Sequence, residues 1–372
     1  MGKKSRSKVK STSTPTQSKT TTKYYPFVSI CTPTFNRRPF ILNMFDIFQN
    51  QDYPKNRIEW IIVDDGTDSI EDLIQSSKIS QIKYFRVQDK MSLGKKRNYM
   101  HSLISAKSEY IIYFDDDDWY PHDHISHAIE SLENNPSFLI AGSSELYCYF
   151  KCTKAENGSI IKPSKLIQFG PYSQNHSTAG TFCFRRKLLS ITKYDDSKEL
   201  AEEKDFLQNY TIPIYQLNPL KSLLVFSHEH NTFDKRTLLE NPNQFMKVSE
   251  KTVDTFFRAD NRMDQKIKHF FMEEIDDLLN KYEDGEPKNK PNVLKQINEI
   301  NMKRNSEIQN TIPVPENNQK QIFIQKPGEE PQLLNQAQII ELIQIQQDKI
   351  EYLTQHIIKL EEQCNILQMK II

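Results

Sequence analysis

Short apolar runs alternate with amphipathic segments from residue 27 onward. Four of the runs lie at residues 27–32, 58–63, 82–86 and 110–114. Apolar runs of this length, bounded by polar residues, predict strands that are buried on both faces. Apolar residues at helical spacing lie between them at 41–48 and in residues 95–106. This alternation predicts an α/β fold, with a parallel sheet covered by helices on both faces.

The second half of the chain has a more mixed pattern. We expect strands at 138–140, 146–150, 181–184 and 223–226, a helix around 199–210, and helices over 246–282. The next residues are rich in Lys, Asn, Gln and Pro, which is typical of a linker. The predicted domains are a disordered basic tail at 1–23, the α/β domain at 24–234, a helical extension at 235–282, a linker at 283–335 and a coiled coil at 336–372.

The last segment carries a heptad repeat. The a positions are Ile343, Ile350, Ile357, Cys364 and Ile371, and the d positions are Ile339, Gln346, Leu353, Leu360 and Leu367. Ile at a with Leu at d favours a parallel two-stranded coiled coil, and hence a homodimer. The alternative is a single amphipathic helix that packs on the domain.

Composition narrows the class of protein. The 49 basic and 49 acidic residues cancel, which argues against a nucleic-acid binder. The odd number of cysteines, 5, suggests free thiols in a reducing compartment. The first residues lack the apolar core of a signal peptide, and no run approaches the roughly 20 apolar residues of a transmembrane helix. We therefore expect a cytoplasmic protein.

Four consecutive carboxylates, residues 115–118, directly follow the strand predicted at 110–114. Ligands bind beyond the carboxyl ends of strands in such sheets. Adjacent carboxylates repel one another, and a hard cation such as Mn²⁺ or Mg²⁺ prefers oxygen ligands. An acidic surface turn is the alternative, but the apolar strand before the run and Trp119 after it favour a metal site.

Four motifs occur in order at residues 28–37, 61–68, 94–98 and 114–119. Together they resemble the catalytic domain of glycosyltransferase family 2, over residues 27–230. The resemblance implies an A-type glycosyltransferase fold, which is a Rossmann-like mixed sheet with flanking helices. It also implies inverting transfer of a sugar from a nucleotide diphosphate to an acceptor hydroxyl, with Mn²⁺ or Mg²⁺ as the cofactor.

The same resemblance assigns donor-binding roles. Thr32, Pro33 and Asn36 would line the nucleotide. Asp64, or less favourably Asp65, would accept the imide hydrogen of uracil, which favours a UDP-linked donor. An ionised carboxylate suits that role because it accepts hydrogen bonds and donates none.

Further roles fall on the later motifs. Arg97 would lie near the diphosphate or ribose, and Asp115 near the ribose and sugar. Asp117 would be the direct metal ligand, with Asp116 and Asp118 supporting it, and Asp115 is a further candidate ligand. We expect the neighbouring Lys95 and Lys96 to be exposed in the first turn of a helix.

The general base is expected in residues 201–207, which resemble the family's acidic segment. This chain has Glu-Glu where the family usually has Glu-Asp. The alignment places Glu203 in the base position and leaves Glu202 and Asp205 as alternatives.

A further metal ligand is expected from His228, with His230 second. We expect His122, His124 and His127 to lie at the exposed start of a helix. Residues 177–182 would border the acceptor.

Two other functions compete with the transferase. A nucleotidyltransferase would carry a glycine-rich loop after the first strand, and residues 32–36 contain no glycine. A catalytically inactive transferase-like domain in a coiled-coil assembly protein is opposed by the intact motifs at 64–66 and 115–118.

Overall fold

The computed structural model describes residues 23–151, 153–154, 160–231, 235–240 and 242–311, and isolated positions from 323 to 356. The chain divides into two units, Met1–Asn301 and Met302–Ile372. In the second unit, β15 (Phe323–Ile324) pairs antiparallel with β16 (Gln332–Leu333). The described positions between 338 and 356 are helical, but most of the predicted coiled coil and the tail at 1–22 lie outside the described residues.

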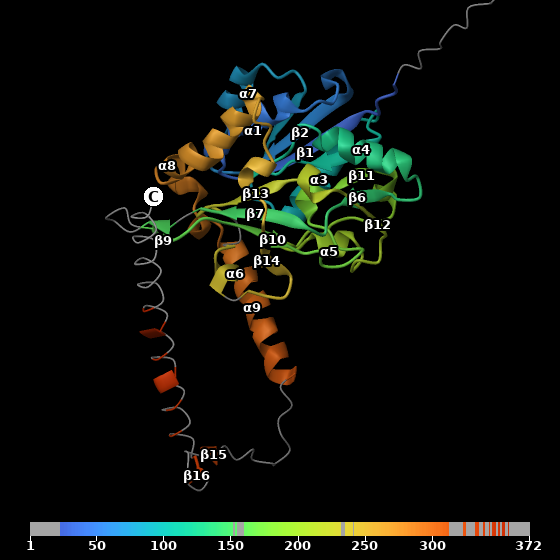
Figure 1. The fold of residues 1–372 in the computed structure, drawn as a ribbon. Helices are drawn as coiled ribbons and strands as arrows, with labels where there is room; N and C mark the ends of the chain where they lie inside the picture. Colours follow the sequence, from blue (N-terminus) through green and yellow to red (C-terminus); the bar gives the residue numbers. More distant parts are fainter. Residues whose placement is uncertain are drawn as a thin grey trace, which may run out of the picture. The chain divides into compact units, whose positions relative to one another are not determined.

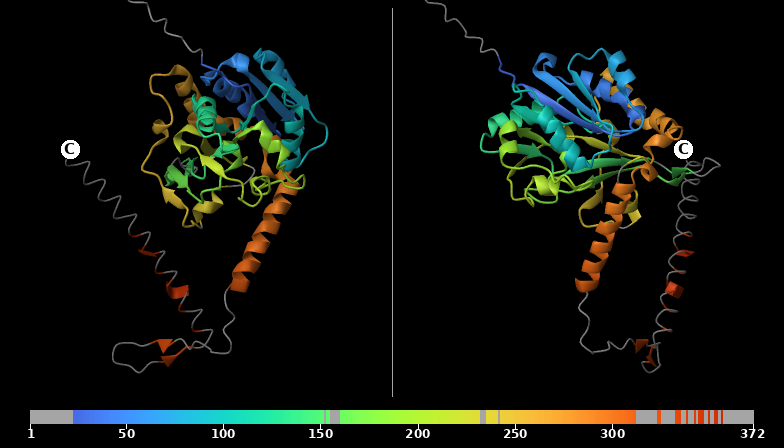
Figure 2. Two further views of the ribbon diagram at one scale, coloured as in Figure 1. Left: turned by 90° about the vertical axis from the view of Figure 1, so that its right-hand side faces the viewer. Right: turned by 180° about the vertical axis from the view of Figure 1, so that it is seen from behind.

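The first unit is built on a seven-stranded sheet (Figures 1 and 2). In spatial order its strands are β12 (Ile214–Gln216), β6 (Ile140–Gly142), β11 (Cys183–Arg185), β4 (Tyr110–Tyr113), β1 (Val28–Thr34), β2 (Ile58–Asp64) and β3 (Ile82–Arg86). The strands from β4 to β3 run parallel, whereas β11 is antiparallel to both of its neighbours. The sheet is therefore mixed, and the expected α/β class is confirmed.

Helices cover both faces of this sheet, as the alternating pattern predicts. The main helices of this region are α1 (Arg38–Asn50), α2 (Glu71–Ser77), α3 (Leu93–Leu103) and α4 (His124–Asn134). Apolar residues of α1 and α4 share one core with Val28 and Ile30 of β1, while Met100 of α3 packs in the other core with Cys31. Successive strand residues point to opposite faces, so β1 contributes to both cores.

A second sheet lies against the first and contains β14 (Met246–Val248), β10 (Lys165–Phe169), β7 (Leu146–Phe150), β13 (Leu224–Ser227) and β5 (Asp118–Trp119). The chain leaves β4 in the first sheet and enters β5 in the second within five residues. The aspartate run therefore lies where the two sheets meet. Two short strands, β8 (Thr153–Lys154) and β9 (Ile160–Lys162), form a separate pair.

Two of the predicted helices are wrong in extent. The helix expected at 199–210 is only α5 (Glu203–Phe206), because Gln208, Asn209 and Tyr210 all have positive φ angles that end it. The segment at 246–282 begins with β14 and becomes helical only at α7 (Arg262–His269), which continues through a π-helical turn into α8 (Ile275–Leu279). Apolar residues of this segment, such as Phe256 and Ile267, are buried.

The predicted linker is contradicted over its first part. Residues 283–301 belong to the first unit, with short 3-10 turns at Glu283–Gly285 and Pro287–Asn289 followed by α9 (Pro291–Thr311). Lys290 and Val293 are buried. Polar contacts with distant residues hold this segment in place. Its composition is therefore as polar as that of a solvated linker, although the segment is packed on the domain. No described helix has the length and apolar character needed to cross a bilayer.

Candidate active site

A pocket of about 330 Å³ opens beyond the carboxyl ends of β1 and β4. Its wall is formed by Pro33, Thr34, Phe35, Arg37, Lys90, Met91, Leu93, Lys96, Arg97, Asp115, Asp116, Asp117, Asp118, Ala179, Gly180, Glu199, Leu200, Glu202, Asn231, Lys235, Lys290 and Val293. Acidic and basic side chains are interleaved along this wall. This is the position at which open α/β sheets bind ligands.

Asp117, which lines the pocket between β4 and β5, contacts His228, which follows β13 and is not itself part of the wall. The Asp117 Oδ2 atom lies 3.2 Å from His228 Nε2 and 3.2 Å from an Arg37 guanidinium nitrogen. Burial opposes ionisation of Asp117, but Arg37 and the His228 hydrogen bond outweigh it and lower the pKa of this carboxyl. Burial lowers the pKa of His228 to about 4, so its imidazole is neutral at physiological pH and can act as a metal ligand.

The other three aspartates of the run resist ionisation. Burial, followed by repulsion from Asp117, raises the pKa of Asp116 to about 7 and that of Asp118 well above its usual value. Burial also raises the pKa of Asp115. A bound cation would favour the ionised forms of these carboxyl groups.

The donor set fits a hard divalent cation only in part. Asp117 and His228 are brought together, and Asp115 Oδ1 is buried without a hydrogen-bond partner. However, no cluster of three or more His, Cys, Asp or Glu ligands is assembled within the described ranges. Two protein ligands leave most positions of a six-coordinate Mg²⁺ or Mn²⁺ open, which suits an ion that takes phosphate oxygens from a substrate.

Arg97 on α3 joins two carboxylates at the pocket floor. Its Nε atom lies 2.9 Å from Glu202 Oε1, and a terminal nitrogen lies 3.5 Å from Asp115 Oδ1. The guanidinium also lies 4.2 Å from the centre of the Tyr113 ring. Gly180 packs so closely against Asp115 that a Cβ atom there would come 2.7 Å from its Oδ2 atom. The segment expected to border the acceptor therefore contacts the predicted sugar-binding aspartate.

The three candidate bases occupy different environments. Glu202 lines the pocket and is buried in its ion pair with Arg97. Glu203 begins α5, and burial followed by repulsion from Glu202 raises its pKa to about 7. Neither Glu203 nor Asp205 is part of the pocket wall, and Asp205 forms an ion pair with Lys198 at 3.7 Å.

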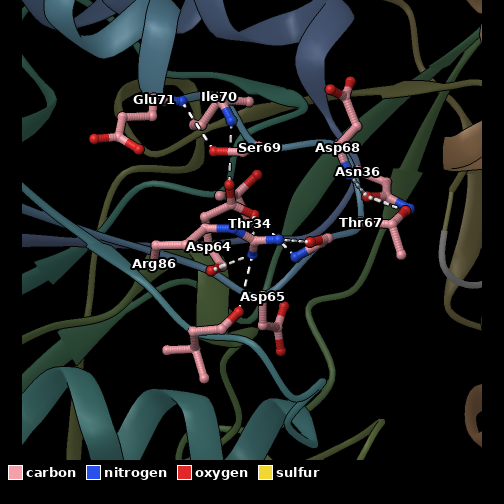
Figure 3. A network of polar contacts seen from close by, with 12 residues as sticks. Thr34, Asn36, Asp64, Asp65, Thr67, Asp68, Ser69, Ile70, Glu71 and Arg86 are labelled. Carbon is pink, nitrogen blue, oxygen red and sulfur yellow. Dashed lines mark hydrogen bonds and ion pairs between the residues drawn. The ribbon is translucent and has the colours of Figure 1, made fainter.

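Asp64 is not in the pocket, contrary to its expected contact with the base. Its carboxylate accepts a hydrogen bond from Ile70 N at 3.3 Å (Figure 3). It also accepts hydrogen bonds from Gly66 N at 2.9 Å and the Tyr84 hydroxyl at 2.7 Å. Arg86 lies nearby at 3.7 Å. The Asp64 carboxylate therefore stabilises the turn after β2, because the backbone amides of that turn point toward it.

Asp65 does not line the pocket, but it holds two residues that do. It forms an ion pair with Lys96, and its Oδ2 atom accepts a hydrogen bond from Met91 N at 2.7 Å. Lys96 and Met91 both line the pocket. The prediction that Lys96 is exposed was wrong, since its ammonium group also donates to Thr34 O at 3.0 Å.

The first loop was only partly predicted. Of the three residues expected to line the nucleotide, only Pro33 is part of the pocket wall. Thr32 is buried and accepts a hydrogen bond from Trp60 Nε1 at 2.9 Å. Asn36 instead bonds to Thr67 at 3.0 Å and to Asp284 O at 2.9 Å.

Two histidine predictions also need correction. His124 is fully buried, with its Nδ1 atom 3.1 Å from Lys221 O, rather than exposed at the start of a helix. His230, the second metal candidate, is not part of the pocket wall; its carbonyl oxygen accepts a hydrogen bond from Arg37 at 2.7 Å. Arg37 lies in the motif at residues 28–37, but nothing in the sequence assigned a role to it. Lys290 lies in the segment predicted to be a linker, where no motif indicates a functional residue.

Residues 29–191 match the family model described as "Glycosyl transferase family 2". The chain contains a glycosyltransferase family 2 domain. The match includes the aspartate run, Arg97 and Gly180, and it supports the A-type fold. Glu202 and Lys290 lie beyond it, so part of the pocket wall comes from outside the matched region, and so does His228, the contact of Asp117.

Two curated relatives align with the glycosyltransferase family 2 domain. A GalNAc(5)-diNAcBac-PP-undecaprenol beta-1,3-glucosyltransferase of Campylobacter jejuni is 32% identical over 142 residues, which are 37% of this chain and 41% of that protein. The abequosyltransferase RfbV of Salmonella typhimurium is 26% identical over 125 residues, which are 32% of this chain and 37% of that protein. The chain thus spans less than half the length of these relatives.

Among solved structures, TarS of Staphylococcus aureus in complex with UDP-GlcNAc is 20% identical, with a TM-score of 0.40. The overlap covers 55% of this chain and 59% of that one. At this TM-score the likeness does not place any residue of the site.

Proposed function

We propose that this protein transfers a sugar from a nucleoside diphosphate sugar to a hydroxyl group of an acceptor, with inversion. The observation that carries the proposal is the pocket itself, where the aspartate run meets buried Arg37, Lys96 and Arg97. Cationic side chains suit a diphosphate, and carboxylates suit a divalent ion that bridges to it. The family match to residues 29–191 supports the same chemistry.

Asp117 and His228 are the residues that would hold Mn²⁺ or Mg²⁺. When bound, the ion supplies positive charge to the diphosphate leaving group. Arg37 contacts Asp117 at 3.2 Å and Asp116 at 3.5 Å, and it therefore positions this edge of the site.

We assign the general base to Glu203 and a positioning role to Glu202. A carboxyl group with a pKa near 7 is well matched to accepting a proton at neutral pH. Glu202 is committed to Arg97, which it holds beside Asp115. A single displacement requires one base, and it inverts the configuration at the sugar carbon.

The donor base is proposed to be uracil, although the expected contact with Asp64 is not formed. The alternative, Asp65, is fully buried behind the pocket wall, so it could favour uracil only through Met91 and Lys96, which it holds in place. Calorimetric titration of the full chain with UDP and GDP in the presence of Mn²⁺ tests this choice. Clear preference for GDP would show that the assignment of the base is wrong.

The activity is tested by measuring release of nucleoside diphosphate from a panel of UDP- and GDP-sugars with Mn²⁺ or Mg²⁺. We expect release with at least one donor, and Glu203→Gln should still bind the diphosphate while losing release. A wild-type protein that neither binds UDP or GDP nor releases either would refute the proposed function and leave the inactive assembly protein as the better explanation.

A further inference from the structure

The segment from residue 283 to the start of α9 brings side chains to the pocket from outside the matched family domain. Asn36 donates a hydrogen bond to Asp284 O at 2.9 Å. Gln296 accepts one from Glu199 N at 3.0 Å and donates one to Ser197 O at 2.9 Å. These contacts fix the segment at both ends of the pocket, so that Lys290 and Val293 form part of its wall.

Lys290 is a buried basic residue, and burial lowers the pKa of its ammonium group to about 7. Its side chain is only 4% exposed, yet no hydrogen bond or ion pair joins its ammonium group to another of the described residues. In contrast, Arg37, Lys96 and Arg97 each form an ion pair with a carboxylate of the site. Burying an unpaired charge is costly, and such a group in a pocket is suited to an anionic ligand.

The surroundings of Lys290 point to the same ligand. It interacts electrostatically with Arg37 and Lys96, which repel it, and with Asp116 and Asp117, which attract it. All five residues line the same pocket, so Lys290 shares its wall with Asp117, which is proposed to hold a divalent ion. A phosphate group placed there would be attracted both to the three basic side chains and to the ion.

The first turn of α9 adds backbone charge at this point. The first hydrogen bond of the helix runs from Leu294 N to Lys290 O at 3.1 Å, so the amides of Asn292 and Val293 precede the helical ladder. Such a terminus carries partial positive charge and favours anions. Pro291, at the first helical position, has no amide hydrogen to leave unpaired.

We propose that Lys290 and the first turn of α9 bind the diphosphate of the donor. This inference rests on the proposed function and adds to it a phosphate-binding element contributed by a segment after the family domain. Lys290 contacts phosphate oxygens and helps to neutralise charge on the leaving group.

The test compares Lys290→Met with Lys288→Met in the full chain. Lys288 is a matched control, because it lies two residues away and its side chain is 63% exposed in an ion pair with Glu286. Calorimetry with Mn²⁺ measures the affinity for UDP and GDP and for uridine and guanosine. We expect Lys290→Met to weaken binding of the preferred diphosphate by roughly 10- to 100-fold, the loss typical of a charged hydrogen bond, and to leave nucleoside binding unchanged.

Two further variants complete the design. Lys290→Arg retains the charge and should restore most of the affinity for the diphosphate. If Lys290→Met does not fold, as judged by tryptophan fluorescence, Lys290→Gln is titrated in the same way.

The outcomes separate this inference from the function on which it rests. A wild-type protein that binds no diphosphate refutes both. Wild-type binding that is unchanged in the Lys290 variant overturns only the present inference. An equal loss for the diphosphate and the nucleoside also overturns it, because Lys290 would then shape the pocket without contacting phosphate.

Discussion

Replacement of Arg97 by methionine tests the electrostatic centre of the site. The guanidinium is 3% exposed and lies between Glu202, at 2.9 Å, and Asp115, at 3.5 Å. Methionine retains much of the side-chain length that packs on Tyr113, but it removes the charge. Buried Glu202 and half-buried Asp115 then lose the cation that they share.

The expected loss of unfolding free energy is about 3–5 kcal/mol, which is typical when one partner of a buried ion pair is removed. Lys266→Met is the control, because it removes one partner of an ion pair at the surface. Lys266 pairs with Asp46 at 2.6 Å, but its side chain is 64% exposed. Removal of such a pair costs only about 0.2–1 kcal/mol. The difference in unfolding free energy between the two variants measures how much burial strengthens the ion pairs of Arg97.

Urea unfolding, followed by fluorescence of Trp60 and Trp119, provides the assay, because both indoles are buried in the first unit. The pH dependence has a defined sign. Burial already raises the pKa of Asp115, and loss of Arg97 raises it further. A carboxyl group whose pKa is higher in the folded state stabilises that state at low pH, and this contribution is lost as the pH rises. The deficit of Arg97→Met should therefore be larger at pH 8 than at pH 5.

A double variant checks the assignment to particular partners. Adding Glu202→Gln to Arg97→Met removes one of the uncompensated charges and should recover part of the loss, which would appear as coupling between the two sites. The reasoning is refuted if Arg97→Met costs no more than Lys266→Met, or if its deficit does not change with pH.

The remaining predictions concern the chemistry and the tail. Asp117→Asn should abolish transfer without unfolding the protein, because a neutral amide is a poor ligand for a hard cation, and Asp116→Asn should have a smaller effect; wild-type activity of the Asp117 variant in excess Mn²⁺ would contradict the metal assignment. The rate of transfer should rise with pH through about 7 as Glu203 ionises, and a rate that does not change across this range would exclude Glu203 as the base. Deletion of residues 333–372 should convert a dimer into a monomer with an unchanged rate per site, and light scattering that shows a monomeric full chain would contradict the coiled coil.

Local sequence patterns determined much of the first unit. Apolar runs predicted β1, β2 and β4, because strands buried on both faces need continuous apolar side chains. The strand predicted at 82–86 also forms, as β3, but it lies at the sheet edge and none of its residues is buried. The positions of the polar motifs at strand ends then predicted where the pocket would form, since parallel strands end at one edge of a sheet. The aspartate run and Arg97 both line that pocket.

Only the tertiary structure decided which side chains of each motif reach the pocket. Asp64 and Asp117 both follow buried strands, but amides of the local turn capture Asp64, while Asp117 meets Arg37 and His228. Lys96 is a second example, because its burial depends on an ion pair with Asp65, which follows a different element of the chain, β2. A motif places residues along the chain, but the orientation of each side chain depends on donors and acceptors that folding brings to it.

The segment that follows the family domain shows that local patterns also fail to predict contacts between residues far apart in the chain. Its Lys, Asn and Pro content is typical of a linker, and only contacts between distant residues reveal that it packs on the site. Asn36 and Asp284, which are hydrogen-bonded, are separated by 248 positions. Local periodicity carries no information about such a pairing, because the stabilising partner lies elsewhere in the chain. The burial of Lys290 beside the aspartates was therefore decided by the tertiary structure alone.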